Sequence, residues 1–197
     1  MKIAKIVSSN SHIDYVGRVI DSLDAAEPPA ADDFGFAQFV GLPVDERTEI
    51  VGVIYDSVLV NPEYSNFGPR LSPKPELGHF SPDYLNEQGV LIGILLLGSR
   101  DPEGKIAHGV PRRVVPAGQD VFRLDPAATK DFHTDANDCL QLHYYSQVVA
   151  HAGPFAVPLL EAIIEQLTLD CTAADRQRLG VLKQTLLWQR TMSGMRL

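Results

Sequence analysis

The sequence predicts an α+β protein: a small, closed or nearly closed antiparallel β-barrel of about six strands, followed by a C-terminal helical region. Short apolar segments fill the first two-thirds of the 197-residue chain, and turn-forming residues separate them. Glycines recur inside these segments, as is typical of strands that bend to close a small barrel. From about residue 125 onward, apolar residues recur at helical spacing. We therefore expect a barrel over residues 1–124 and helices over residues 125–197.

Six segments are the expected strands. Each combines β-branched or aromatic residues with a turn signal on at least one side, and no helix pattern alternates with them. A parallel α/β sheet is therefore not expected. The expected strands are residues 2–7, 12–20, 34–42, 49–60, 90–98 and a weaker segment within 108–124.

A long loop is predicted at residues 61–85, between two of these strands. It holds five prolines together with several aromatic rings, whereas a disordered linker rarely carries so many rings and a packed strand rarely carries so many prolines. Two interpretations stay open: the loop covers the barrel, or it presents side chains to a partner. The candidate interaction residues are Tyr64, Phe67, Arg70, His79, Phe80 and Tyr84.

The helical region has recognisable start signals. Asp125 before Pro126 is typical of a helix N-cap followed by the first helical residue. Residues 137–149 are expected to be helical or mixed, and residues 155–167 place Phe155 and five aliphatic residues on one broad face. Thr172 and Asp175 resemble a capping box at the start of a last helix, in which Leu179, Leu182 and Leu186 form an apolar stripe.

Composition limits the classes of function. The formal net charge is −8 and the sequence pI is about 5.1, so a surface built to neutralise nucleic-acid phosphates is not expected, and direct nucleic-acid binding is disfavoured. A polybasic membrane-binding patch is equally unsupported. Two cysteines without a CxxC pair indicate a reducing compartment, and no apolar run reaches the length of a signal peptide or a membrane-spanning helix. We expect a cytoplasmic protein.

Familiar catalytic motifs are absent from the sequence, including the P-loop, GxGxxG, GxSxG and HExxH patterns. The densest group of reactive side chains contains His133, Cys139 and His143. A helix would place Cys139 and His143 on one face, where they could form a thiolate–imidazole pair or supply two metal ligands. A small metal- or thiol-dependent hydrolase is therefore the alternative function. The simpler interpretation makes these residues part of the core and the surface, with no catalytic residue, cofactor or metal.

The barrel segments resemble the HAS barrel, the small β-barrel shared by HerA-type DNA-translocating ATPases and by subunits of the catalytic ring of rotary ATP synthases. The resemblance rests on residues 2–20, 34–42, 49–60 and 115–132. Gly17–Val19, Pro116–Gly118 and the helix from Asp125 stand where the family has a strand opening the barrel, a proline–glycine element and a polar helix. The resemblance to the HAS barrel covers about residues 1–130.

The resemblance implies a stand-alone barrel, because about 70 helical residues occupy the place of the family's ATPase domain. No catalytic residue is carried over, since the family's catalysis lies in that domain. Relatives pack their barrels into a ring on the ATPase hexamer and dock accessory subunits such as nucleases. The predicted function is thus a non-catalytic adaptor in DNA processing, with a HerA-type ATPase ring or a nuclease as its protein partner, and with homo-oligomerisation as a further expectation.

Overall fold

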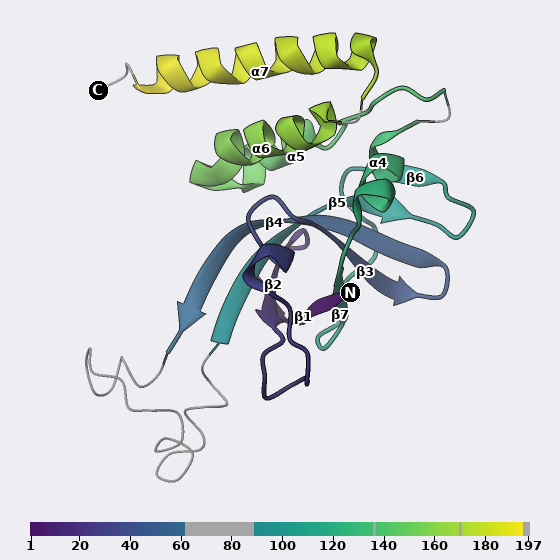
Figure 1. Ribbon diagram of the computed structural model, residues 1–197, viewed down its shortest axis with the longest axis vertical. Coiled ribbons are helices and arrows are strands. Elements are labelled where there is room, and N and C mark those ends of the chain that lie inside the picture. The colour runs from purple at the N-terminus through teal and green to yellow at the C-terminus, as the bar shows by residue number, and fades with distance from the viewer. Residues whose placement is uncertain (62–88, 136, 170, 195–197) are drawn as a thin grey trace.

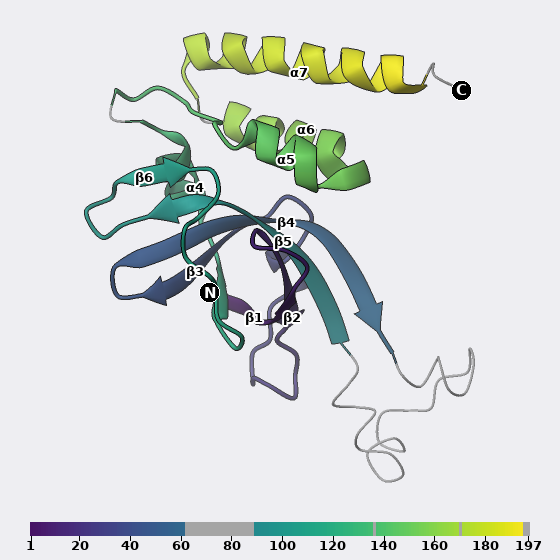
Figure 2. The same ribbon diagram turned by 180° about the vertical axis from the view of Figure 1, so that it is seen from behind.

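A computed structural model describes residues 1–61, 89–135, 137–169 and 171–194 of the chain. The strands form a barrel, and a layer of helices lies across one end of it (Figure 1). The last helix forms an outer level on that layer, on the side away from the strands, as the reverse view also shows (Figure 2). The molecule is thus built from a strand-rich body and a helical cap, and this agrees with the predicted α+β class.

The barrel is closed by six antiparallel strands. Their order around the barrel is β1, β2, β5, β4, β3 and β7, and β7 pairs again with β1. The short strand β6 adds to one edge of β5 outside this ring. The predicted antiparallel barrel is confirmed. Its strands are β1 (Lys2–Ser9), β2 (Asp14–Val19), β3 (Phe39–Asp45), β4 (Thr48–Val60), β5 (Gly89–Arg100), β6 (Ile106–His108) and β7 (Asp120–Arg123).

Strand β5 joins three neighbours. One edge pairs with β4 along the whole of β5, whereas the other edge pairs with β2 over residues 91–95 and with β6 over residues 98–100. β6 approaches so closely that a Cβ on Gly98 would overlap the carbonyl oxygen of Ala107 and lie 3.1 Å from the ring of Phe132. Gly98 therefore permits β6, and the helix that carries Phe132, to lie against the barrel.

The hydrophobic core fills the barrel and continues into the helical layer. The central strands read as nearly continuous buried runs, and the first two strands alternate between buried and more exposed residues. Burial of this apolar surface is the main favourable term in folding. Fully buried large side chains include Phe39, Leu42, Ile50, Ile54, Ile94, Leu96, Phe132 and Tyr144.

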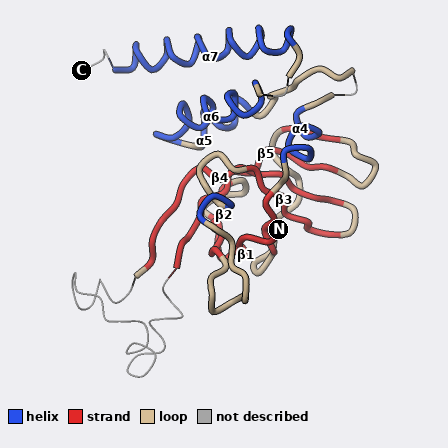
Figure 3. The backbone as a smooth tube through the Cα atoms, viewed as in Figure 1, coloured by secondary structure: helices blue, strands red, loops and turns tan. Residues whose placement is uncertain are grey.

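The helices follow β7 in the order α4 (Pro126–His133), α5 (Tyr145–His151), α6 (Ala156–Thr168) and α7 (Ala173–Gly194). The helices α5, α6 and α7 lie apart from the red strands, whereas α4 lies beside them (Figure 3). As predicted, Asp125 caps α4: its carboxylate accepts a hydrogen bond of 2.7 Å from the backbone N–H of Ala128, and Pro126 begins the helix. Thr172 likewise accepts from the N–H of Asp175 at 3.1 Å before α7.

The apolar face predicted over residues 155–167 is largely confirmed. The five aliphatic residues of that face are buried, but Phe155 is not part of α6 and remains 38% exposed. It belongs to the short 3-10 helix η2 (Gly153–Phe155), in which Gly153 has a φ of +53°. The change of direction at Gly153 explains why Phe155 does not extend the buried face of α6. Leu159, Leu160, Ile163, Ile164 and Leu167 are the buried residues.

One predicted strand is wrong in its bounds. The strand expected over residues 34–42 begins only at Phe39, because the 3-10 helix η1 (Ala31–Asp33) and a left-handed backbone at Ala37 (φ +64°) precede it. Residues 137–149, expected to be helical or mixed, are mixed, since α5 begins only at Tyr145. Before it, the side chain of Asp135 accepts hydrogen bonds from the N–H groups of Asn137 and Cys139, which holds this segment as a loop.

The predicted interaction loop, residues 61–85, lies outside the described residues from position 62 onward. None of the helices in the described part of the chain combines the length and the apolar character needed to cross a lipid bilayer.

Candidate functional site

A cluster of histidine, tyrosine and phenylalanine side chains joins the barrel to its helical cap. We call it the histidine–tyrosine cluster, and it consists of His108, Phe132, His133, His143 and Tyr144. β6 supplies His108, α4 supplies Phe132 and His133, and the turn before α5 supplies the other two residues. The ring of His108 lies 4.5 Å from that of Phe132 and 5.2 Å from that of Tyr144, measured between centroids. Three separate elements therefore meet at these rings.

His133 is buried at the centre of this cluster with both ring nitrogens bonded. Its Nδ1 lies 2.7 Å from the carbonyl oxygen of Thr129, which only accepts, so Nδ1 carries the proton. Its Nε2 then accepts a hydrogen bond of 2.7 Å from the hydroxyl of Tyr144. Burial, with a smaller contribution from nearby His108, lowers the pKa of His133 to about 4. His133 is thus a neutral histidine that ties α4 to the segment before α5.

His108 makes a parallel connection between β6 and the same two segments. Its Nε2 donates a hydrogen bond of 2.8 Å to the carbonyl oxygen of Phe132, and its Nδ1 accepts at 3.3 Å from the backbone N–H of His143. Burial lowers the pKa of His108 as well. The hydroxyl of Tyr144 is fully enclosed, and burial raises the pKa of that tyrosine. In their neutral forms, His108, His133 and Tyr144 make the hydrogen bonds that hold these elements together.

The candidate hydrolase residues are only partly brought together. His133 and His143 both belong to the histidine–tyrosine cluster, but Cys139 and His143 do not share a helix face, since the chain between them is a loop. In the described residues, no group of three or more histidine, cysteine or acidic side chains is placed to hold a metal ion. No observation at these positions favours a thiolate–imidazole pair over a structural role.

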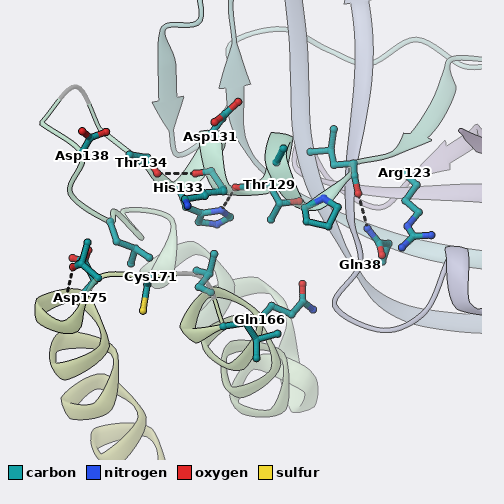
Figure 4. Close-up of a pocket in the computed structure, with 18 residues that line it drawn as sticks. Gln38, Arg123, Thr129, Asp131, His133, Thr134, Asp138, Gln166, Cys171 and Asp175 are labelled. Carbon is teal, nitrogen blue, oxygen red and sulfur yellow. Dashed lines mark hydrogen bonds between the residues drawn. The ribbon is translucent and has the colours of Figure 1, made fainter.

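A pocket of about 1110 Å³ lies beside this cluster, between the barrel and the helices. Figure 4 shows its labelled residues, with Gln38 and Arg123 from the barrel side, His133 from α4, and Gln166 and Asp175 from the two last helices. Cys171 lies in this pocket, in the link between α6 and α7, and Cys139 does not line it. The pocket therefore lies at the boundary between the strand-rich body and its helical cap.

Most polar side chains of this pocket fasten one element to another. Gln166 donates to the carbonyl oxygen of Ala37 at 3.0 Å, and Gln38 donates to that of Leu124 at 3.2 Å. Arg123 forms an ion pair of 2.6 Å with Asp33. Asp175 is buried and accepts a hydrogen bond of 2.7 Å from the hydroxyl of Thr172. These bonds position α6, α7 and the β2–β3 connection rather than leaving reactive groups open to a substrate.

The outer half of β4 presents a different kind of surface. β3 pairs with β4 only as far as Val53, and the backbone of Ile54 bonds to residues 37 and 38. Residues 56–60 pair with β5 alone among the described strands, so their other edge carries no strand within the described chain. Val58 and Leu59 lie on this projecting segment and are 54% and 80% exposed. Figure 1 shows it extending away from the helical cap.

Sequence reasoning missed His108, Tyr144 and the buried Gln147. His108 bonds to a residue 24 positions away and Tyr144 to one 11 positions away, and no local periodicity signals such pairs. Gln147 donates from α5 to the carbonyl oxygen of Leu96 on β5. A polar residue on an otherwise apolar helix face is the signal that could have identified it, because buried amides require partners.

Comparison with known proteins places the whole fold in one family. A family model described as a domain of unknown function (DUF8166) matches residues 1–196, which include both the barrel and its helical cap. A search of curated proteins gave no match. The match therefore treats the strand-rich body and the helices as one unit.

Proposed function

The chain belongs to the DUF8166 family, and we propose that it is a non-catalytic interaction protein whose barrel binds a protein partner. The observation that carries this proposal is the projecting segment of β4, residues 56–60, whose second edge pairs with no strand of the described residues and whose Val58 and Leu59 are exposed. An open strand edge offers backbone N–H and C=O groups that an extended segment of another chain can pair with. Apolar side chains beside the edge add buried area to such a contact.

The bonding of the histidines supports a non-catalytic role. A general base needs a free lone pair within reach of a substrate proton. In His133 that lone pair accepts from Tyr144, and the opposite nitrogen donates to Thr129. His108 is bonded at both nitrogens in the same way. Both ring nitrogens of each imidazole therefore already take part in hydrogen bonds that connect elements of the fold.

The class of partner follows from the resemblance to the HAS barrel. It supports a HerA-type DNA-translocating ATPase ring, or a nuclease associated with one, as the protein that this barrel binds. In this proposal the chain acts as an adaptor in DNA processing. The projecting segment of β4 leads directly into the region of the candidate residues Tyr64 and Phe67, so both lie on one continuous stretch of chain.

A matched pair of variants tests this proposal. We expect Leu59→Lys to reduce binding to the HerA-type ATPase of the same organism by about tenfold or more, because a lysine at an open edge opposes strand addition and interface anchors carry most binding energy. Binding is measured by calorimetry or by co-elution with the purified ATPase. The control is Val110→Lys, which changes a similarly exposed aliphatic residue (60% exposed) outside the strands.

Two results would count against this interaction. Equal losses in both variants would indicate that the site lies elsewhere, and wild-type protein that shows no affinity for the ATPase or its nuclease would remove the proposed partner. Circular dichroism of each variant confirms that the fold is retained.

A further inference from the structure

Charge is segregated along the chain. Residues 173–197, which include α7, contain Arg176, Arg178, Lys183, Arg190 and Arg196 against a single carboxylate, Asp175, for a net charge of +4. Because the whole chain carries −8, the preceding 172 residues carry −12. A basic helix is therefore attached to an acidic body, and this contrast does not depend on the adaptor role proposed above.

The outward face of α7 combines cationic and apolar side chains. Leu179 and Leu186 are buried, and α7 packs on α6. Val181 and Trp188 lie two turns apart and point away from that contact, and they are 61% and 65% exposed. Arg176 and Arg178 are exposed at the start of the helix, one on each side of this outward face, and Arg178 also forms an ion pair of 3.6 Å with Asp175. We call Arg176, Arg178, Val181 and Trp188 the basic face of α7.

Trp188 and the arginines resemble the anchors of protein interfaces. Tryptophan and arginine are the residue types that most often carry binding energy, whereas lysine is depleted in interface centres. The α7 lysine, Lys183, is less exposed and pairs with Glu165 of α6 at 2.7 Å. The basic face is thus better suited to a protein surface than to a phosphate backbone, which requires a denser row of cations.

A surface of complementary charge lies in the connection between β2 and β3. Residues 21–33, between β2 and β3, contain five carboxylates and no lysine, arginine or histidine. Arg18 and Arg123 neutralise some of these, but Glu27 and Asp32 are exposed and have no ion pair among the described residues. Leu23 in the same segment is 61% exposed. Figures 1 and 2 show the dark loop of this connection below the barrel, on the side away from α7, and the short helix η1 that ends the connection beside the strands.

We propose that the basic face of α7 docks against the acidic segment, residues 21–33, of a second copy of the chain. In this head-to-tail contact, Arg176 and Arg178 lie opposite Glu27 and Asp32, and Val181 and Trp188 cover Leu23. The partner is identified by charge: contact between two α7 helices would bring two segments of +4 together, and like charges suppress such pairings. Because the two surfaces differ, the association extends into a ring or a filament.

The sole tryptophan of the chain reports on this contact directly. Trp188 is the only tryptophan, so its emission reflects the basic face of α7 alone. We expect the emission to shift to shorter wavelength as protein concentration rises, together with an increase in mass measured by sedimentation. Because the Debye length shortens from about 10 Å at 0.1 M salt to about 3 Å at 1 M, the dissociation constant is expected to rise by tenfold or more over that range.

Charge reversal provides the decisive test. One variant carries Arg176→Glu and Arg178→Glu, and the other carries Glu27→Lys and Asp32→Lys. Each variant alone is expected to be monomeric, because the side chains at positions 27 and 32 and those at positions 176 and 178, which lie opposite one another in the contact, then carry the same sign of charge. An equimolar mixture is expected to regain association, since each variant supplies what the other lacks. The matched control, Arg112→Glu with Glu103→Lys, changes exposed charges elsewhere and is expected to associate like the wild type.

Four results would overturn the proposal. The first is a wild-type chain that stays monomeric up to about millimolar concentration, above the range of ordinary specific contacts. The second and third are self-association that survives either charge reversal, and a mixture of the two variants that fails to regain self-association. The fourth is a wild-type chain whose α7 arginines bind DNA or another acidic protein without self-association. Far-ultraviolet circular dichroism of each variant separates loss of contact from loss of fold.

Discussion

Replacing Phe132 with alanine is expected to lower the free energy of unfolding by about 3–5 kcal/mol. Phe132 is 1% exposed, and its ring lies 4.5 Å from that of His108 and 6.3 Å from that of Tyr144. Truncation removes buried apolar area and leaves a cavity where β6, α4 and the start of α5 meet. Denaturant unfolding followed by circular dichroism measures the change.

The control for this prediction is Phe36→Ala. Phe36 is 46% exposed and contacts the ring of Phe155, at 6.1 Å between centroids, on the surface. Its truncation is expected to cost about 1 kcal/mol or less, as is usual for surface positions. If the two variants lost similar amounts of unfolding free energy, the packing around Phe132 would not be what holds the helical cap on the barrel.

Acidification is expected to destabilise the fold through His133. Its pKa in the folded chain is about 4, below the value of about 6.5 expected when unfolded, so the unfolded state binds the proton more readily. The contribution of neutral His133 is therefore complete above about pH 6.5 and is lost as pH falls toward 4. At 1.36 kcal/mol per pKa unit, the loss reaches about 3 kcal/mol. Denaturant titrations at several pH values measure it.

A comparison of variants isolates this histidine from other titrating groups. His133→Gln can keep an acceptor for Tyr144 but cannot be protonated, so the fall in its stability between pH 6.5 and 4 is expected to be smaller than in the wild type. His108, whose pKa is also lowered by burial, accounts for part of the remaining slope. His151→Gln, at an exposed position, should retain the wild-type slope. Identical slopes in all three proteins would show that His133 does not couple protonation to folding.

Local signals predicted most of the fold because the elements themselves are local. The alternation in β2 and the long apolar run of β5 predicted strands, and the Asp125–Pro126 pair predicted the start of α4. Residues 34–38 are not a strand because they follow η1 and contain the left-handed Ala37, and residues 137–139 form a loop because their N–H groups bond to the side chain of Asp135. Such competition between a carboxylate and the regular backbone pattern is decided by local geometry, which hydrophobic periodicity does not register.

The site was harder to predict because it is made by distant residues. Sequence spacing suggested that Cys139 and His143 act together, but the loop between them removed the helical relation on which that suggestion depended. The hydroxyl of Tyr144 that bonds to His133 and the backbone groups that bond to His108 come from other elements, and only closure of the barrel against its cap brings them near. The edge of β4 that pairs with no strand of the described residues is likewise a property of the whole sheet, since β3 ends its pairing with β4 at Val53.

The pairing of β7 with both β1 and β3 has a consequence for biosynthesis. β1 leaves the ribosome well before β7, and its ladder with β7 forms only after residues 120–123 have been made. Until then β1 and β3 each carry an open edge, the kind of surface that promotes aggregation of nascent chains. We therefore expect the barrel to close late in translation, in one cooperative step, and the emerging polypeptide to depend on chaperone protection until that step is complete.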